Sequence, residues 1–216
     1  MSMPFLDKLL QRGTTSTELS AQGTDAGERL VAAGMAPYEE TTREGHHFHC
    51  TSTTATASVV ALPTTAAGIS IWNAAGDDGK SIIIDAIYAI NIVGHGSLGQ
   101  FGLICVAGQT DVVTNSGTLV VRKNNGNGPA NDSIALVAPG ATALDAVTGV
   151  AIGWIPMGTS EKQSVISLPG VVLWAPVNGR IIVPPARLFG VNVIGPNATN
   201  TFNIGVMWHE KELTLG

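Results

Sequence analysis

Three of the five histidines of the chain stand together in the stretch EGHHFHC, at residues 44–50. His46, His47 and His49 are followed by Cys50, and imidazole and thiolate groups are common ligands of zinc and related metals. In an extended strand, the side chains of His47 and His49 point to one face and that of His46 to the other. An H-x-H pair on one face could chelate a metal ion, so this stretch is the first candidate for chemistry.

The residues around the pair do not complete a metal site. The spacing resembles the start of a cupin motif, in which a glutamate follows H-x-H after a few residues, but HFHCTSTTATAS continues without an acid. His95 stands in a glycine-rich loop, and His209 stands beside Glu210 near the end of the chain. We therefore expect the polar edge of a domain or a subunit contact here, with no bound metal and no cofactor.

The stretch GHGSLG at residues 94–99 matches the G-x-G-x-x-G pattern of dinucleotide-binding loops. That pattern needs a helix directly after it, because the helix N-terminus binds the pyrophosphate. The following sequence, QFGLICVAG, is typical of a strand, and Leu119 and Val120 stand where the ribose-binding acid would be. A hairpin loop is the better interpretation.

The acidic residues suggest no catalytic pair. Asp77 and Asp78 occupy a glycine-flanked turn, where aspartate caps the backbone. Asp85 is unusual because it interrupts the apolar run SIIIDAIYAINIV, and it could face solvent or an oligomer contact. A pair of carboxylates could hydrolyse a glycosidic bond, but the spacing indicates no such pair. We predict no catalytic residue and expect that the chain is not an enzyme.

The composition favours a sheet protein that is covered by other chains. Of the 216 residues, 44% are hydrophobic and only 12% are charged, about half the usual charged share. The net charge of −5 and the absence of a basic stripe argue against nucleic acid as a ligand. No apolar run is long enough to span a membrane. With two cysteines, the chain has no disulfide framework.

Residues 1–50 are predicted to form an N-terminal arm with short helices. Phe5, Leu6, Leu9 and Leu10 lie on one side of a short helix in the stretch PFLDKLLQ. A helix of this length is marginal in water unless its apolar side is buried. The arm could pack on its own domain or dock on a neighbouring subunit, and these four residues are the candidates for docking.

From residue 51 to residue 216 the hydrophobic period changes to two. Runs such as GISIWN, SIIIDAIYAINIV and VVLWAPV alternate with turns, and no helical pattern of ten residues intervenes. Such a series predicts an all-β antiparallel sandwich, with a jelly roll as the favoured topology. Each of the four tryptophans is expected in the core or at an interface.

Two stretches share a pattern of strands and tight turns. Residues 61–92 contain a strand ending in asparagine, a glycine-rich turn with Lys80 and a long apolar strand. Residues 183–212 contain a proline pair, a strand, a Gly/Asn turn and a closing strand with Trp208 and Glu210. Together they resemble small virion proteins of tailed bacteriophages, some of which decorate or cement the capsid or form head fibres, often as trimers of jelly-roll domains.

The resemblance implies a structural virion protein without an active site. Such a protein would self-associate, with a homotrimer favoured, and would bind the major capsid protein or another virion component. It would assemble in the host cytoplasm and reside in the virion. The alternative is a glycan-binding β-sandwich of a receptor-binding fibre, and a cupin-like metal protein is a third candidate.

Overall fold

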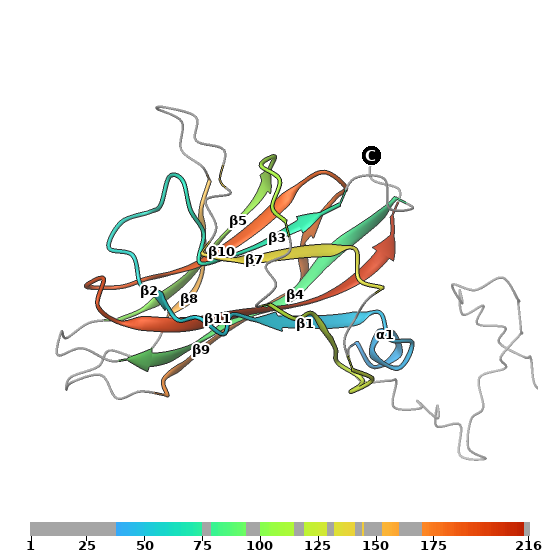
Figure 1. Cartoon of the computed structure of the whole chain (residues 1–216), viewed down its shortest axis with the longest axis horizontal. Coiled ribbons are helices and arrows are strands. Elements are labelled where there is room, and N and C mark those ends of the chain that lie inside the picture. Colours follow the sequence, from blue (N-terminus) through green and yellow to red (C-terminus); the bar gives the residue numbers. More distant parts are fainter. Residues whose placement is uncertain are drawn as a thin grey trace, which may run out of the picture. The chain divides into compact units, whose positions relative to one another are not determined.

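The described part of the chain is an antiparallel β-sandwich. The computed structural model describes residues 38–74, 79–93, 100–114, 119–128, 132–140, 144, 153–159 and 170–213 (Figure 1). These residues belong to a compact unit that begins at Tyr38. Phe5, Leu6, Leu9 and Leu10, the predicted docking residues, lie outside the described residues.

Eleven strands and one short helix are present in these ranges. They are α1 (Glu39–Arg43), β1 (His47–Thr51), β2 (Thr56–Ala57), β3 (Ile69–Asn73), β4 (Lys80–Val93), β5 (Gly102–Gln109), β6 (Arg122–Lys123), β7 (Ala135–Pro139), β8 (Ile155–Thr159), β9 (Val172–Val183), β10 (Leu188–Ile194) and β11 (Thr201–Glu212). Among the described residues, no helix has the length and apolar composition that crossing a membrane would require.

The strands form two sheets. One has the order β6-β1-β11-β4-β9, with β2 also paired to β11, and the other has the order β7-β3-β10-β5-β8. Strands far apart in sequence are therefore neighbours: β1 pairs with β11, β3 with β10, β4 with β9 and β5 with β8, all antiparallel. The prediction of an all-β antiparallel sandwich with very little helix is confirmed.

Alternation within the strands explains how the two sheets pack. In β9, Leu173, Ala175 and Val177 are buried between the sheets, and the residues between them are exposed. Side chains of β1, β4 and β11 in the same sheet, and of β3, β5 and β10 in the opposite sheet, complete the core, in which Phe48 and Trp208 lie with ring centroids 6.1 Å apart. A half-buried strand with period two buries one row of side chains and leaves the other on the outer face.

The stretch EGHHFHC leads directly into a strand of the sandwich. Its last four residues begin β1, which lies between β6 and β11 in the six-stranded sheet. The polar segment becomes a strand because β11 supplies a full-length partner, with His47 opposite His209 and Thr51 opposite Gly205. The compact unit that contains the sandwich begins before this stretch, at Tyr38.

Candidate functional site

An irregularity in β4 sets Asp85 apart from its neighbours. In the pairing with β11, Ala86 lies opposite Met207 and Ile84 opposite Trp208, so Asp85 has no residue directly across from it. In the pairing with β9, residues 177–180 face Asp85 alone. A bulge of this kind redirects a side chain and interrupts the ladder. Asp85 is thereby held on the outer side of the six-stranded sheet, yet it is only 3% exposed.

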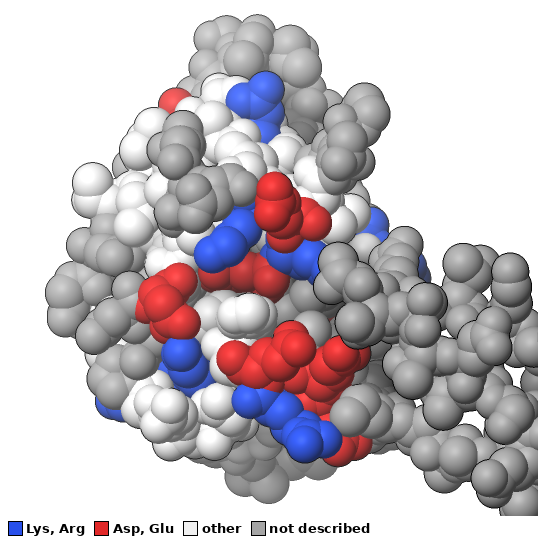
Figure 2. Space-filling model, turned by 90° about the vertical axis from the view of Figure 1, so that its right-hand side faces the viewer, with Lys and Arg blue, Asp and Glu red and all other residues white. Residues whose placement is uncertain are grey.

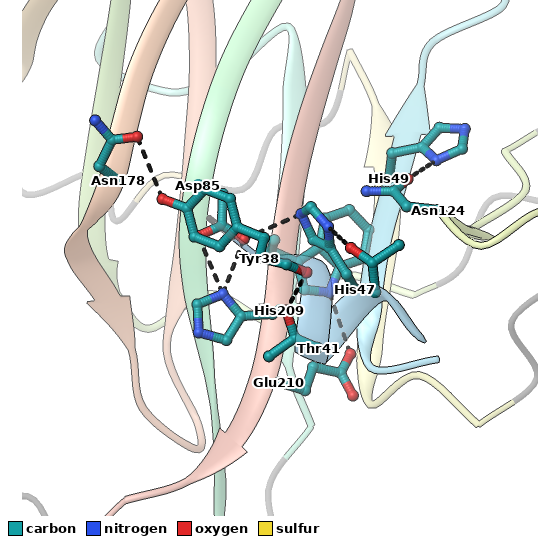
Figure 3. Close-up of polar contacts among 11 residues, drawn as sticks. Tyr38, Thr41, His47, His49, Asp85, Asn124, Asn178, His209 and Glu210 are labelled. Atoms are coloured by element: carbon teal, nitrogen blue, oxygen red, sulfur yellow. Dashed lines mark hydrogen bonds and ion pairs between the residues drawn. The ribbon is translucent and has the colours of Figure 1, made fainter. Parts of the chain in front are cut away.

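Two histidines lie against this buried carboxylate (Figure 3). His47 and His209 are directly opposite each other on β1 and β11. Nδ1 of His209 is 2.8 Å from Oδ2 and 3.0 Å from Oδ1 of Asp85, within hydrogen-bonding distance of both. Nε2 of His47 is 3.2 Å from Oδ2, close enough for an ion pair, but its orientation makes no hydrogen bond with any described residue.

Tyr38 and Thr42 cover this His–Asp–His cluster. The ring of Tyr38 lies 5.5 Å from that of His47 and 5.9 Å from that of His209, between centroids. Its hydroxyl donates to Oδ1 of Asn178 on β9 over 3.2 Å. Oγ1 of Thr42, in α1, lies 2.9 Å from Nδ1 of His47. Tyr38 and Thr42, near the start of the described unit, therefore cover the outer side of the cluster.

The charge of Asp85 is stabilised by its partners. Burial raises the pKa of this carboxyl, but the contacts with His209 and then His47 lower it by more, so the net pKa is below its ordinary value. Burial, together with the nearby charge of Asp85, raises the pKa of the Tyr38 hydroxyl. An ionised carboxylate between two imidazoles under a neutral phenol is the expected state at neutral pH.

The contacts from Thr42 through His47 to Asp85 follow the order of nucleophile, base and carboxylate in a catalytic relay. In such a relay the carboxylate must hold the histidine by an aligned hydrogen bond. Here the aligned hydrogen bond of Asp85 goes to His209 instead. The arrangement is therefore better suited to fastening α1 and β1 to the sheet than to activating the threonine hydroxyl.

The other residues of EGHHFHC do not join the cluster. Nδ1 of His49 contacts Oδ1 of Asn124. His46 is exposed, and its Nδ1 lies 3.9 Å from Oε2 of Glu44. Cys50 points into the core, where burial raises the pKa of its thiol to about 12. Among the residues that the structure describes, no group of three or more His, Cys, Asp or Glu could hold a metal ion.

Glu210, next to His209 in sequence, lies on the other side of β11. Its Oε1 accepts hydrogen bonds from the Ser133 hydroxyl at 2.7 Å and from Nε1 of Trp208 at 3.1 Å, and both carboxylate oxygens accept from the backbone of Ile134. Burial raises the pKa of Glu210, although these hydrogen bonds lower it in part. The carboxylate fastens the segment before β7 to the core.

A second feature of the same outer face is an apolar patch, which we call the β4–β9 strip. Its register places Tyr88 opposite Trp174, and Ile90 opposite Val172. The strip consists of five residues: Tyr88, Ile90, Ile92, Val172 and Trp174. Val172 is 58% exposed, Trp174 53%, Ile92 40% and Ile90 36%. These side chains lie on β9, the last strand of its sheet, and on its only neighbour there, β4, within the described residues.

Tyr88 and Trp174 form a flat aromatic pair in this strip. Their centroids are 5.5 Å apart and their planes differ by 19°. Tyr88 reaches across Gly205, where an added Cβ would lie 2.3 Å from the ring, to a hydrogen bond of 2.7 Å with Thr51. The glycine is required because it lets the ring lie down on the sheet.

Charged side chains are gathered elsewhere. Figure 2 looks onto the end of the sandwich that carries α1, and acidic and basic residues are interspersed there without a large area of one sign. Lys123 and Asp132, for example, form an ion pair of 2.8 Å. The β4–β9 strip includes no charged residue, so it differs in character from that end.

Comparisons with protein-family models, with curated proteins and with solved structures found no match.

The sequence indicated some of these residues. His47 and His209 are among the candidate ligands, and Asp85 is unusual in its apolar run, but nothing in their spacing joins them because they lie on three different strands. No sequence signal marks Tyr38 or Asn178. The one available signal was an aspartate within a β-branched run, which is costly to bury without partners.

Several other candidates cannot be placed. His95, the glycine pattern at 94–99, Asp77 and Asp78 lie outside the described residues.

Proposed function

We propose that this chain is a self-associating structural protein of the tailed-bacteriophage virion, which decorates or stabilises the capsid or another virion component and catalyses no reaction. The observation that carries the self-association is the β4–β9 strip. It leaves roughly 400 Å² of mostly apolar surface uncovered, comparable to the largest patch on a typical monomer and often a sign of an interface.

The pairing of the strands supports a jelly roll. In that topology a long antiparallel hairpin is rolled up so that each strand of the first arm pairs with one of the second. Four pairs of this kind are present: β1 with β11, β3 with β10, β4 with β9, and β5 with β8. Jelly rolls are frequent in viral capsid proteins, which is compatible with a place in a virion.

The virion assignment itself depends on the resemblance of residues 61–92 and 183–212. These stretches contain β3 and β4, and β10 and β11, respectively. Because β3 pairs with β10 and β4 with β11, the two resembling stretches together supply the middle of both sheets. The resemblance therefore concerns one contiguous part of the sandwich instead of two unrelated fragments.

Light scattering of the purified chain tests self-association. We expect an oligomer, with a trimer favoured, and we expect Val172→Glu to shift it toward the monomer. Ile155→Glu is the matched control, because Ile155 is also an apolar residue of an edge strand, 42% exposed, but lies in the other sheet. A wild-type chain that stays monomeric at micromolar concentration would refute the proposed function.

Peptide mass spectrometry of purified phage particles tests the virion assignment. Particles produced from the genome that encodes this chain should contain it in many copies. Its absence from such particles would contradict a role in the virion.

A second candidate function is glycan binding at the tip of a fibre. The observation that favours it is the stacked pair of Tyr88 and Trp174. Sugars stack on exposed aromatic faces, and about half of the surface of Trp174 is exposed. Glycan-array binding that is lost in Trp174→Ala, while the oligomer remains intact, would favour this alternative.

A further inference from the structure

The β4–β9 strip is too small to form a stable interface by packing against its own copy. A standard interface buries about 800 Å² on each partner. Two strips pressed together would contribute about half of that, roughly 400 Å² each. If the chain self-associates as proposed above, additional surface must be buried, and it must be apolar and able to reach the strip.

Pairing edge to edge is disfavoured as the way to gain that surface. Pro176 lies within β9 and has no N–H to donate, so the run of edge donors is interrupted. Residues 177–180 depart further from regular pairing, with positive φ angles of 52° at Asn178 and 73° at Gly179. The strip is therefore better suited to accept a segment laid across its face than to extend the sheet.

The N-terminal sequence contains such a segment. In residues 4–11, the spacing of Phe5, Leu6, Leu9 and Leu10 predicts one apolar side for a two-turn helix, which would be about 12 Å long. The strip is of matching length, since Tyr88 and Ile92 are four residues apart on β4, or about 13 Å. Both surfaces are apolar, and neither has a counterpart among the described residues that would cover it.

The place where the described chain begins puts this segment within reach. Tyr38 is fastened to Asn178 on β9, only four residues, or about 13 Å, from Trp174. The 26 residues between Gln11 and Tyr38 can span at most about 3.3 Å each, or roughly 86 Å in total. That length reaches the strip of the same chain and also the strip of a neighbouring sandwich, and only the second contact would bury surface between subunits.

We infer that residues 4–11 dock on the β4–β9 strip of a neighbouring copy, so that the subunits exchange N-terminal arms. The inference rests on the proposed self-association and names its contact. The chain enters at Tyr38, at the end that carries α1, whereas Ile92 and Val172 are near the opposite end of their strands. Arm exchange between unlike ends is head to tail, and a head-to-tail contact forms a ring such as a trimer when the rotation between subunits closes.

Cysteine crosslinking between two differently tagged chains tests the contact. One chain carries Leu9→Cys and the other Val172→Cys, and they are mixed, refolded together and oxidised with oxidised glutathione. Cys50 and Cys105 are buried, and burial raises the pKa of both thiols to about 12, so they remain unreactive in the folded protein. We expect a disulfide that joins the two tags.

The matched control replaces Val172→Cys by Ile155→Cys, and it should give a severalfold weaker crosslink. In parallel, deletion of residues 1–12 should convert the oligomer to a monomer that retains its β-sheet circular dichroism. A crosslink no stronger than the control, or an intact oligomer after the deletion, would each overturn the inference.

Light scattering separates this failure from failure of the proposed function. If Val172→Glu dissociates the oligomer but the deletion does not, the strip mediates self-association and only the arm exchange is wrong. If the full-length chain is a monomer at micromolar concentration, the proposed function itself fails.

Discussion

Replacing Asp85 by asparagine removes one negative charge from the cluster without changing its shape. In the native protein Asp85 is 3% exposed, and its oxygens lie 2.8 and 3.0 Å from Nδ1 of His209. Asparagine keeps one acceptor oxygen, so the main loss is one hydrogen bond to a charged group, about 1.5–3 kcal/mol. We expect the free energy of unfolding to fall by about 2 kcal/mol near pH 6.5, and the melting temperature to fall by about 4–8 °C.

The pH dependence gives this prediction a sign. The pKa of Asp85 is lower in the folded protein than its ordinary value of 3.8, so the folded state binds this proton less readily than the unfolded state. Its contribution to stability is therefore complete above pH 3.8 and is lost as the pH falls through the folded pKa. The difference between wild type and Asp85→Asn should shrink toward zero in that acidic range.

Urea unfolding followed by tryptophan fluorescence, at several pH values between 3 and 7, measures both effects. Asp132→Asn is the control, because Asp132 is a surface partner of Lys123 and should change stability by less than about 0.5 kcal/mol. A difference for Asp85→Asn that is absent near pH 6.5, or that is constant down to pH 3, would refute the account of the cluster.

Three further predictions concern the rest of the sandwich. Gly205→Ala places a Cβ 2.3 Å from the ring of Tyr88, so it should lower the free energy of unfolding by about 1–3 kcal/mol and alter the near-ultraviolet circular dichroism. In the control Gly158→Ala the new Cβ would meet nothing closer than 3.6 Å and stability should hardly change, so equal effects of the two variants would contradict the packing argument. The pKa of Glu210 is raised in the folded protein, so the stability linked to its proton is present below pH 4.5 and is lost as the pH rises through the folded pKa. In urea titrations, Glu210→Gln should therefore gain stability relative to wild type toward neutral pH, and a loss of stability relative to wild type over this range would contradict the sign. The two buried cysteines should react with a thiol reagent such as DTNB only after unfolding, and rapid labelling of the native protein would show that they are not enclosed.

The architecture could be predicted from the sequence because its signals are local. Alternation in VVLWAPV gives the buried and exposed rows of β9, and the long run of β-branched residues gives β4. The strand at His47 could not be predicted, because this polar stretch becomes a strand only through pairing with β11, more than 150 residues later in the chain.

The candidate site depends on topology to an even greater degree. His209 and Asp85 are 124 residues apart, and they meet only because β4 and β11 are neighbours and a bulge turns the carboxylate outward. The tryptophans show the same limit. Trp208 is fully buried, whereas Trp174 is 53% exposed, and only the sheet order distinguishes the core from the surface.

The pairing of β1 with β11 brings the start and the end of the sandwich close together, which decides where peptides can be fused and where the chain can be circularly permuted. Because His47 lies opposite His209, and Lys80 opposite Glu212, the polypeptide enters and leaves the sandwich at the same end. Foreign peptides fused before Tyr38 or after Leu213 would thus project from one end of the sandwich. A circular permutant that links these two points and opens elsewhere should retain the fold, since the linker need only bridge two neighbouring strands.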